Sequence, residues 1–237
     1  MTGLPQGKTA PPIIPILVFP AVILIVMCGS NPAVPETPLP HTAPPAADAP
    51  DPVKSGGGAV EEIRRLTENG SPPSLLRALD LIRSREAANT EFGRVMIAVN
   101  AALMQKLYPA VAVQFPSPDP PQTHVYTRIL RDAEKGVYTP PASNSQDYLE
   151  HVLPFLAFYN ETRPERLLTA LPDLRKGAAL NGESVLAPYF LGLLFERTGR
   201  LEEASEQYAR AGQLSPECYP ASLGWARILE AGGRTQD

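Results

Sequence analysis

Residues 185–216 constrain the fold of this chain more than any other stretch, because they have the pattern of a helical hairpin. Apolar residues recur at helical spacing on both sides of a short polar break at residues 198–200. The break contains Gly199, which suits a tight turn. Glu202 and Glu203 follow it, and acidic side chains are favourable at the start of a helix. The stretch therefore predicts one helix, a tight turn and a second helix.

The same stretch resembles the tetratricopeptide repeat, a helix-turn-helix unit of about 34 residues. The resemblance rests on the spacing of small, apolar and aromatic residues, which are Leu191, Gly192, Phe195, Ala204, Tyr208, Ala211 and Pro216. Pro188 departs from the pattern, since that position is usually a Trp. In this family, the residues at the Gly192 and Ala204 positions are small because the two helices cross closely there. The resemblance implies a scaffold that binds other proteins.

Weaker copies of the unit lie on both sides of it. Counted 34 residues forward, Ala170, Leu174 and Gly177 fall on the positions of Ala204, Tyr208 and Ala211 in the second helix. The pattern of the first helix, moved forward by the same length, falls on Trp225, Ala226, Leu229 and Gly233. We therefore expect repeat-like helices over about residues 147–237, with the last helix as a cap. Together with the helices before them, they predict an all-α domain over residues 59–237. Its architecture would be a short helical-hairpin solenoid of about seven to nine helices.

Repeats of this family bind partners on the concave surface formed by their first helices. Carried over position by position, that surface comprises Leu186, Tyr189, Leu193, Glu196, Arg197, Leu223, Arg227 and Glu230, with Pro220 at its start. Members of the family that bind the C-terminal carboxylate of a peptide have Lys and Asn at two of these positions. In this sequence most of the positions are apolar or aromatic. We therefore expect an apolar or aromatic segment of a protein partner. The alternative is that these residues pack against the N-terminal helices and leave no free groove.

Residues 1–28 have the pattern of an export signal or a membrane anchor. Residues 13–27 are apolar without interruption, but as a helix they would rise only about 22 Å, less than the roughly 30 Å of a bilayer core. They end at Cys28 and are similar to a bacterial lipoprotein signal, in which the cysteine becomes the lipidated first residue. Met27 departs from that pattern, which prefers a small residue. Acyl chains such as palmitate would hold the protein firmly, and an uncleaved anchor is the alternative.

Either arrangement places a folded body outside the cytoplasm of a bacterium, attached to a membrane of the cell envelope. Residues 29–58, which follow, contain eight of the 28 prolines and almost nothing to bury. This composition excludes a packed core and favours extended polyproline conformations. We expect a disordered spacer between the membrane and the domain, with a proline-rich ligand for another domain as the alternative.

Three helices are expected in the first part of the body. Residues 59–69 and 74–85 are short and amphipathic, and a longer helix begins after Asn89 or Thr90. Its apolar stripe comprises Phe92, Val95, Met96, Val99, Leu103 and Leu107. Residues 108–119 are apolar but interrupted by prolines, so they either pack over the helices or line a binding surface.

Helices are also expected over residues 123–136, 147–159 and 165–179. Gly136 would end the first of these helices. Pro172 lies inside the last one and should kink or interrupt it, because proline removes a backbone donor and clashes with the preceding turn.

The sequence contains no constellation typical of catalysis or metal binding. The histidines, His41, His124 and His151, lie far apart, and there is no HExxH, GxSxG, CxxC or phosphate-binding loop. We therefore expect no enzyme activity, no cofactor and no metal. A net charge of −4 without a basic stripe argues against a nucleic-acid partner. Cys28 and Cys218 are the two cysteines, which excludes a disulfide framework.

Taken together, these features predict a membrane-tethered, extracytoplasmic scaffold that binds another envelope or membrane protein, for instance beside a transporter or an envelope-assembly complex. The second hypothesis is a carrier of a small hydrophobic ligand. Its cavity would lie between the helix that ends at Leu107, residues 108–119 and the repeats. An envelope enzyme is the third hypothesis, and no motif supports it.

Overall fold

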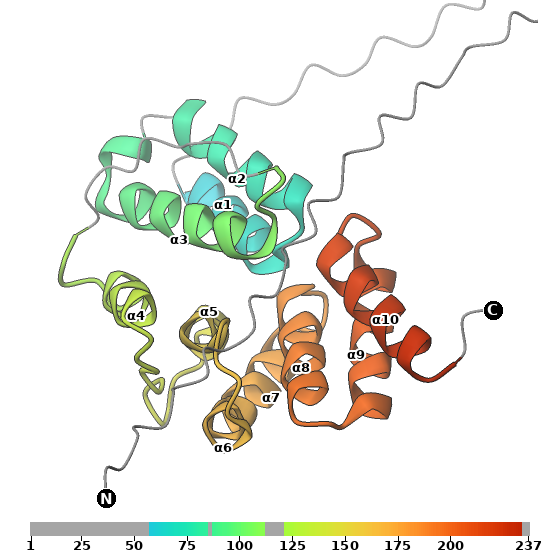
Figure 1. The fold of residues 1–237 in the computed structure, drawn as a ribbon. Helices are drawn as coiled ribbons and strands as arrows, with labels where there is room; N and C mark the ends of the chain where they lie inside the picture. The colour runs from blue at the N-terminus through green and yellow to red at the C-terminus, as the bar shows by residue number, and fades with distance from the viewer. Residues whose placement is uncertain (1–56, 85–86, 112–120, 234–237) are drawn as a thin grey trace, which may run out of the picture. The chain divides into compact units, whose positions relative to one another are not determined.

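A computed structural model describes residues 57–84, 87–111 and 121–233, and within these ranges the regular structure is helical, without strands (Figure 1). The prediction of an all-α domain is confirmed. The predictions for the signal, for Cys28 and for nearly all of the proline-rich spacer fall on residues outside the described ranges. The same holds for most of the apolar segment at 108–119.

The first part of the domain consists of α1 (Gly57–Asn69), α2 (Pro72–Ser84) and α3 (Glu91–Leu107), which pack against one another (Figure 1). Gly70 turns the chain between α1 and α2 at a φ of +73°, where a glycine is favoured. A short 3-10 helix, η1 (Ala87–Asn89), precedes α3. The Thr90 hydroxyl accepts a hydrogen bond from the Gly93 N–H at 3.0 Å, so this predicted cap of α3 is confirmed.

The predicted apolar stripe of α3 faces the core, except that Phe92 is only half-buried. The remaining members of the stripe, Val95, Met96, Val99, Leu103 and Leu107, are buried. Asn100 lies among them, and its amide donates to the Thr67 hydroxyl of α1 at 2.8 Å and to the Met96 carbonyl at 2.8 Å. This buried polar contact ties α3 to α1.

The prediction of one continuous helix over residues 147–159 is wrong. The structure has α5 (Tyr148–Val152) followed by the 3-10 helix η2 (Leu153–Phe158). Pro154 lies at the junction, where its missing N–H stops the α-helical hydrogen-bond pattern. Asp147 caps α5 by accepting from the Leu149 N–H at 3.0 Å. The preceding helix, α4 (Val125–Glu134), packs against η2.

The predicted interruption at Pro172 is confirmed. The chain forms α6 (Pro164–Leu167), then the 3-10 helix η3 (Leu168–Ala170), then α7 (Leu171–Leu180). The break places Pro172 in the first turn of α7, where a helix N–H has no intrahelical partner and its loss costs little.

The last helices are α8 (Leu186–Arg197), α9 (Leu201–Leu214) and α10 (Tyr219–Ala231), and α9 packs extensively against both α8 and α10 (Figure 1). Gly199 makes the predicted turn at a φ of +77°. The ring of Tyr208 lies between two glycines, because a Cβ added at Gly192 would be 2.6 Å from it and one added at Gly224 would be 2.5 Å from it. Both glycines therefore allow α8 and α10 to approach α9 closely.

The turn between α1 and α2 joins the two ends of the domain. The Val185 N–H donates to the Asn69 carbonyl at 2.9 Å, just ahead of α8. The Tyr108 hydroxyl donates to the Gly70 carbonyl at 2.9 Å, and the ring of Tyr108 packs edge-on against Tyr219 with centroids 5.6 Å apart. The end of α3 and the starts of α8 and α10 therefore meet at one place.

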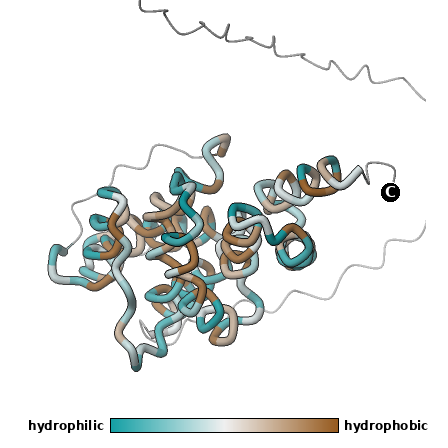
Figure 2. Tube along the Cα trace, turned by 60° about the horizontal axis from the view of Figure 1, so that its bottom comes forward, coloured by the Kyte–Doolittle hydropathy of each residue, from teal (hydrophilic) through white to brown (hydrophobic). Residues whose placement is uncertain are grey.

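Hydrophobic and hydrophilic residues alternate along the helices, as Figure 2 shows. This amphipathic pattern is typical of helices that bury one side in a core. Within the described residues, no helix has both the length and the apolar character needed to cross a bilayer.

Candidate functional site

A hollow of about 310 Å³ opens between α8, α10 and the end of α3, and we call it the repeat-face hollow. It is lined by Leu107, Pro109, Tyr159, Asn160, Tyr189, Leu193, Arg197, Tyr219, Pro220, Leu223 and Arg227. Most of the positions carried over from the repeat pattern are in this lining, namely Tyr189, Leu193, Arg197, Leu223 and Arg227. The packing of α8 and α10 thus brings these residues together in one hollow.

Three of the predicted residues do not line the hollow. Leu186 is 0% exposed and packs against Gly70, where a Cβ would come within 2.2 Å of its side chain. Its predicted contact with a partner is therefore wrong, because the turn between α1 and α2 covers the first turn of α8. Glu196 is half-buried and Glu230 is exposed. The alternative of packing against the N-terminal helices thus applies to Leu186.

Tyr189 and Leu193 form the deep part of the hollow, with only 5% and 7% of their surfaces exposed. The ring of Tyr189 lies 5.5 Å from that of Phe190 and 6.1 Å from that of Tyr208, measured between centroids. Burial raises the pKa of the Tyr189 hydroxyl well above its ordinary value, so the hydroxyl stays neutral. These two side chains offer a fixed apolar and aromatic wall.

Arg197 is held by the backbone at the end of η2. Its guanidinium donates to the carbonyl oxygens of Phe158 at 2.7 Å and Glu161 at 3.2 Å, and also to that of Tyr159. These carbonyls lie at and just after the end of η2, and that of Phe158 also accepts from the Glu161 N–H at 2.8 Å. Arg197 was expected to meet a partner at the edge of the groove. In the structure it positions the Tyr159 segment beside α8.

Glu196 connects α8 to both α9 and α10. The Arg227 guanidinium binds its carboxylate through Nε and Nη2, each at 3.0 Å, and the Tyr208 hydroxyl donates to it at 2.5 Å. A two-pronged arginine contact of this kind fixes geometry as well as charge. Glu196 and Arg227 therefore link α8 to α10, and Arg227 also lines the repeat-face hollow.

Leu223 is an exposed large apolar side chain of this lining, with 57% of its surface accessible. Tyr219 and Pro220 beside it are half-buried. The Tyr219 hydroxyl oxygen is buried and has no hydrogen-bond partner among the described residues. The outer part of the hollow therefore offers Leu223 as an apolar contact point, beside a buried hydroxyl without a partner.

Several lining residues were missed by the sequence analysis. Tyr159 and Asn160 follow η2, and Leu107 and Pro109 lie at the end of α3, far away in the sequence. Only Tyr219 had a usable signal, because it stands one repeat length after Val185. The others reach the hollow through tertiary packing alone.

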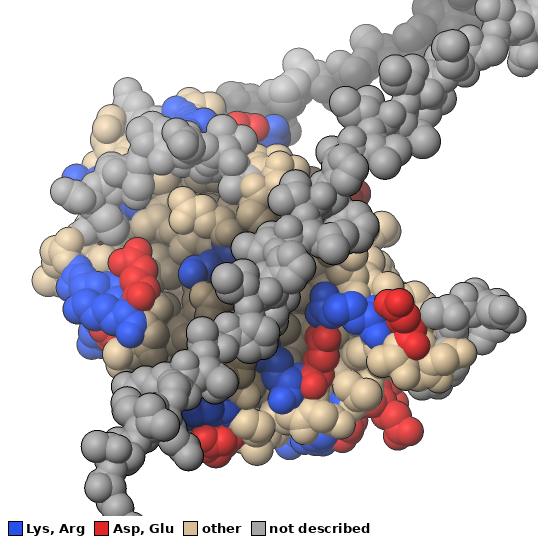
Figure 3. Space-filling view, viewed as in Figure 1, with Lys and Arg blue, Asp and Glu red and all other residues tan. Residues whose placement is uncertain are grey.

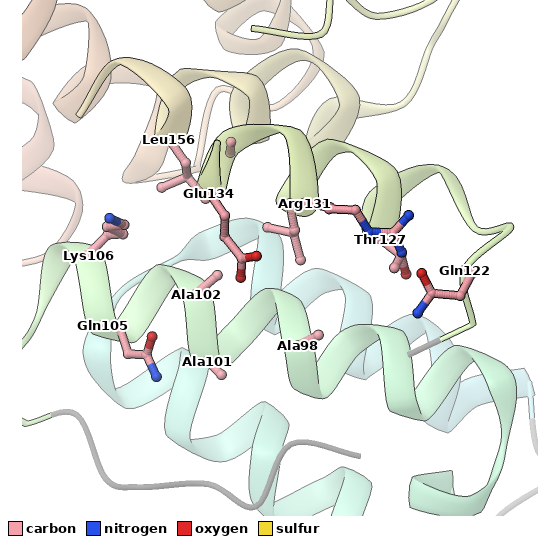
Figure 4. Close-up of a pocket in the computed structure, with 12 residues that line it drawn as sticks. Ala98, Ala101, Ala102, Gln105, Lys106, Gln122, Thr127, Arg131, Glu134 and Leu156 are labelled. Atoms are coloured by element: carbon pink, nitrogen blue, oxygen red, sulfur yellow. The ribbon is translucent and has the colours of Figure 1, made fainter. Parts of the chain in front are cut away.

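A second hollow of about 350 Å³ lies between α3 and α4 (Figure 4). Ala98, Ala101 and Ala102 of α3 form its small-residue side, and Glu134 extends from α4 toward them. Lys106 and Arg131 also line it. We call it the α3–α4 hollow.

The histidines that the structure describes have structural contacts. The Nδ1 atom of His124 accepts from the Tyr126 N–H at 3.2 Å and so caps α4. His151 is buried, with Nδ1 3.8 Å from a carboxylate oxygen of Asp173, whose pKa is raised by burial. Over residues 57–84, 87–111 and 121–233, no cluster of three His, Cys, Asp or Glu side chains is arranged to hold a metal ion.

Basic and acidic side chains lie next to one another on the face shown in Figure 3. Such mixing agrees with a net charge of −4 and does not form the continuous basic surface typical of nucleic-acid binding. Comparisons with protein-family models, with curated proteins and with solved structures find no match to this chain.

Proposed function

We propose that this protein is a tetratricopeptide-like scaffold that binds a segment of another envelope protein in the repeat-face hollow. The observation that carries the proposal is the convergence of Tyr189, Leu193, Leu223 and Arg227 on one concave place, since these positions were selected by the repeat pattern alone. An aromatic and aliphatic lining with arginine at its edge is typical of residues that dominate protein interfaces.

The size of the hollow limits the partner segment. About 310 Å³ can accept a few side chains, so the bound segment is short. Leu223 has 57% of its surface to bury, and full burial of a leucine is worth about 1.5–3 kcal/mol. A short segment anchored on Leu223 would bind reversibly, as suits a scaffold.

The test is photo-crosslinking from matched positions. A photoreactive residue is placed at Leu223 or at Leu201, which is a leucine of comparable exposure, 42%, at the start of α9 and outside the lining of the hollow. The proposal predicts a discrete crosslinked protein from position 223 in the native envelope and not from position 201. Equal crosslinking at both positions, or none at either, would contradict it.

We also propose that Cys28 is lipidated and tethers the domain to the outer side of a bacterial membrane. The support is the apolar stretch at residues 13–27 followed directly by this cysteine. If the proposal is correct, the lipid chains on Cys28 are the firm anchor of the mature protein. Cys28→Ala removes their attachment site and should release the protein from sedimented membranes. Retention of the variant in the membrane fraction would instead favour an uncleaved anchor.

The second candidate function, a carrier of a small hydrophobic ligand, is favoured by the α3–α4 hollow. The hydroxyl of Thr127 in this lining is buried and without a hydrogen-bond partner among the described residues, beside an alanine surface that leaves space. A carrier predicts a lipid or other hydrophobic molecule that copurifies with the protein in native mass spectrometry. Thr127→Trp would fill the hollow and should remove that molecule, whereas Leu223→Asp should leave it bound.

A further inference from the structure

His151 is a buried titratable residue that lies between two helices of the domain. It belongs to α5, and only 3% of its surface is exposed. α5 packs directly against α7 (Figure 1). A Cβ added at Gly177 of α7 would lie 3.3 Å from the Cβ of His151, which shows how closely the two helices approach. The imidazole ring must therefore find its hydrogen-bond partners within the protein.

One side of the ring fixes where the proton lies in the neutral form. Nε2 is 3.3 Å from the carbonyl oxygen of Ser145, in the segment before α5. A carbonyl oxygen only accepts hydrogen bonds, so Nε2 must carry a hydrogen. Neutral histidine has a single N–H, and its Nδ1 is then an acceptor with a lone pair.

The other side of the ring has an acceptor where a donor is needed. Nδ1 is buried and has no hydrogen-bond partner within the part of the chain that the structure describes. A carboxylate oxygen of Asp173 on α7 lies 3.8 Å from it. An ionised carboxylate also only accepts, so two acceptors meet here without a hydrogen between them. A single proton on Nδ1 would give both groups a partner.

The surroundings suit the charged form of the ring. An imidazolium has two N–H donors, and Ser145 and Asp173 supply an acceptor on each side. Burying a charge is costly unless it is paired and hydrogen-bonded, and these two groups offset that cost. Lys176 of α7 acts in the opposite direction, because its ammonium group also donates to the Ser145 carbonyl.

The other charged groups near His151 are engaged elsewhere or lie at the side of the helix. Asp147, at the start of α5, accepts from the Tyr126 hydroxyl of α4 and from the Leu149 N–H. Glu150, the neighbour of His151 in α5, is half-buried. η2, which also packs against α5, has no charged residue. Among the residues that the structure describes, none of the charged side chains of α4 or α8 forms an ion pair with His151.

We propose that His151 and Asp173 form a pH-sensitive latch, which binds one proton between α5 and α7. At neutral pH His151 is neutral, and the Asp173 carboxylate has no donor from it. As the pH falls, Nδ1 takes up a proton, and the imidazolium bridges the Ser145 carbonyl and the Asp173 carboxylate. The two helices are then joined by a buried charge pair. The latch does not depend on what binds in the repeat-face hollow.

The direction of the effect on stability follows from proton linkage. In the unfolded chain water solvates both side chains, so the favourable pairing in the protonated form is lost. The folded pair therefore binds the proton more tightly, and its contribution to stability is present at low pH and lost as the pH rises. Burial also raises the pKa of the Asp173 carboxyl, against a smaller opposing effect of Lys176. One proton changes the folding equilibrium constant by at most about ten-fold per pH unit.

The test is ¹⁵N NMR of the histidine rings in the full chain, labelled with ¹⁵N-histidine, at about pH 7.5 and about pH 5, on either side of the range in which free histidine titrates. Two-bond ¹H–¹⁵N spectra distinguish a protonated ring nitrogen from an unprotonated one. His151→Gln removes the signals of His151 and so identifies them. We expect a hydrogen on Nε2 alone at the higher pH and on both nitrogens at the lower pH.

Asp173→Asn is the matched variant, because it keeps the shape of the side chain but brings an amide that can donate to Nδ1. It should hold His151 in the neutral form with a hydrogen on Nε2, even at about pH 5. In urea denaturation, its folding equilibrium constant should fall relative to that of the parent as the pH is lowered, by up to about ten-fold per pH unit. His124 is the internal control, since its Nδ1 accepts from the Tyr126 N–H and its signals should not change with the substitution.

Four results would overturn the inference. In the parent they are a hydrogen on Nδ1 alone at the higher pH, or a neutral ring at the lower pH. In Asp173→Asn they are a doubly protonated His151 at the lower pH, or the same dependence of stability on pH as in the parent. The parent spectra decide the first two even if the variant does not fold.

Discussion

Gly192→Ala tests how closely α8, α9 and α10 are packed around Tyr208. The added Cβ would lie 2.6 Å from Cδ1 and 2.8 Å from Cε1 of the ring, whereas carbon atoms in contact prefer about 3.5–4.0 Å. The ring cannot retreat, because Gly224 faces it on α10, where a Cβ would lie 2.5 Å away. Its hydroxyl is also held by Glu196. The helices must therefore separate by about 1 Å.

The expected change in the free energy of unfolding combines two opposing effects. Overpacking of this kind costs about 1–3 kcal/mol, and replacing glycine by alanine inside a helix gains about 1 kcal/mol. The net result is a loss of up to about 2 kcal/mol, or a fall of up to about 8 °C in Tm for a domain of this size. Thermal and urea denaturation, followed by far-UV circular dichroism, measure it.

Gly212→Ala is the matched control on α9, because nothing lies within 4 Å of an added Cβ there. It should stabilise the protein by about 0.5–1 kcal/mol through helix propensity alone. In a Tyr208→Leu background, Gly192→Ala should lose most of its cost, since the ring that it strikes is gone. If both glycine variants are stabilised equally, the close packing described around Tyr208 is incorrect.

Three further predictions address other parts of the fold. Thr90→Ala should cost about 1 kcal/mol in urea denaturation, because it removes the cap of α3, whereas the exposed Thr162→Ala should stay within about 0.5 kcal/mol of the parent. Gly93→Ala should cost at least about 3 kcal/mol, because its Cβ would lie 1.7 Å from the Ala87 carbonyl oxygen, while Gly58→Ala, which meets nothing within 4 Å, should not destabilise. Burial raises the pKa of five tyrosines, Tyr108, Tyr126, Tyr148, Tyr189 and Tyr208. Above about pH 10 the unfolded chain therefore loses tyrosine protons that the folded protein retains. The free energy of unfolding should be unaffected by these groups below about pH 10 and should fall above it by up to about 1.4 kcal/mol per pH unit and tyrosine. Tyrosinate absorbance that rises well before unfolding would contradict this last expectation.

Local signals in the sequence were sufficient for most helix boundaries. Thr90 as a cap, Gly199 as a turn and Pro172 as an interruption each act on their own neighbours, and the structure places them as expected. Pro154 has the same kind of local signal and was overlooked, which joined α5 and η2 into one predicted helix. The break between α5 and η2 was therefore predictable from Pro154 alone.

Long-range contacts explain what a repeat pattern could not predict. Leu186 is at a surface position of the repeat, but the distant Gly70 turn covers it. Arg197 is taken up by carbonyls at the end of η2, which the pattern does not contain. Trp225 stands at the position of the buried Leu191, yet it is 42% exposed and donates to the Ser205 hydroxyl at 3.0 Å. These outcomes depend on which segments pack together.

The most direct test of the central claim is the affinity of the crosslinked partner for Leu223→Asp and Leu201→Asp. The two leucines have comparable exposure, so their substitutions should perturb the fold alike, but only Leu223 lines the repeat-face hollow. Loss of an apolar anchor at an interface costs about 1–2 kcal/mol, so Leu223→Asp should weaken binding by about 5–30-fold. Leu201→Asp should bind as the parent does. Equal affinities for the two variants would show that the hollow is not the binding site.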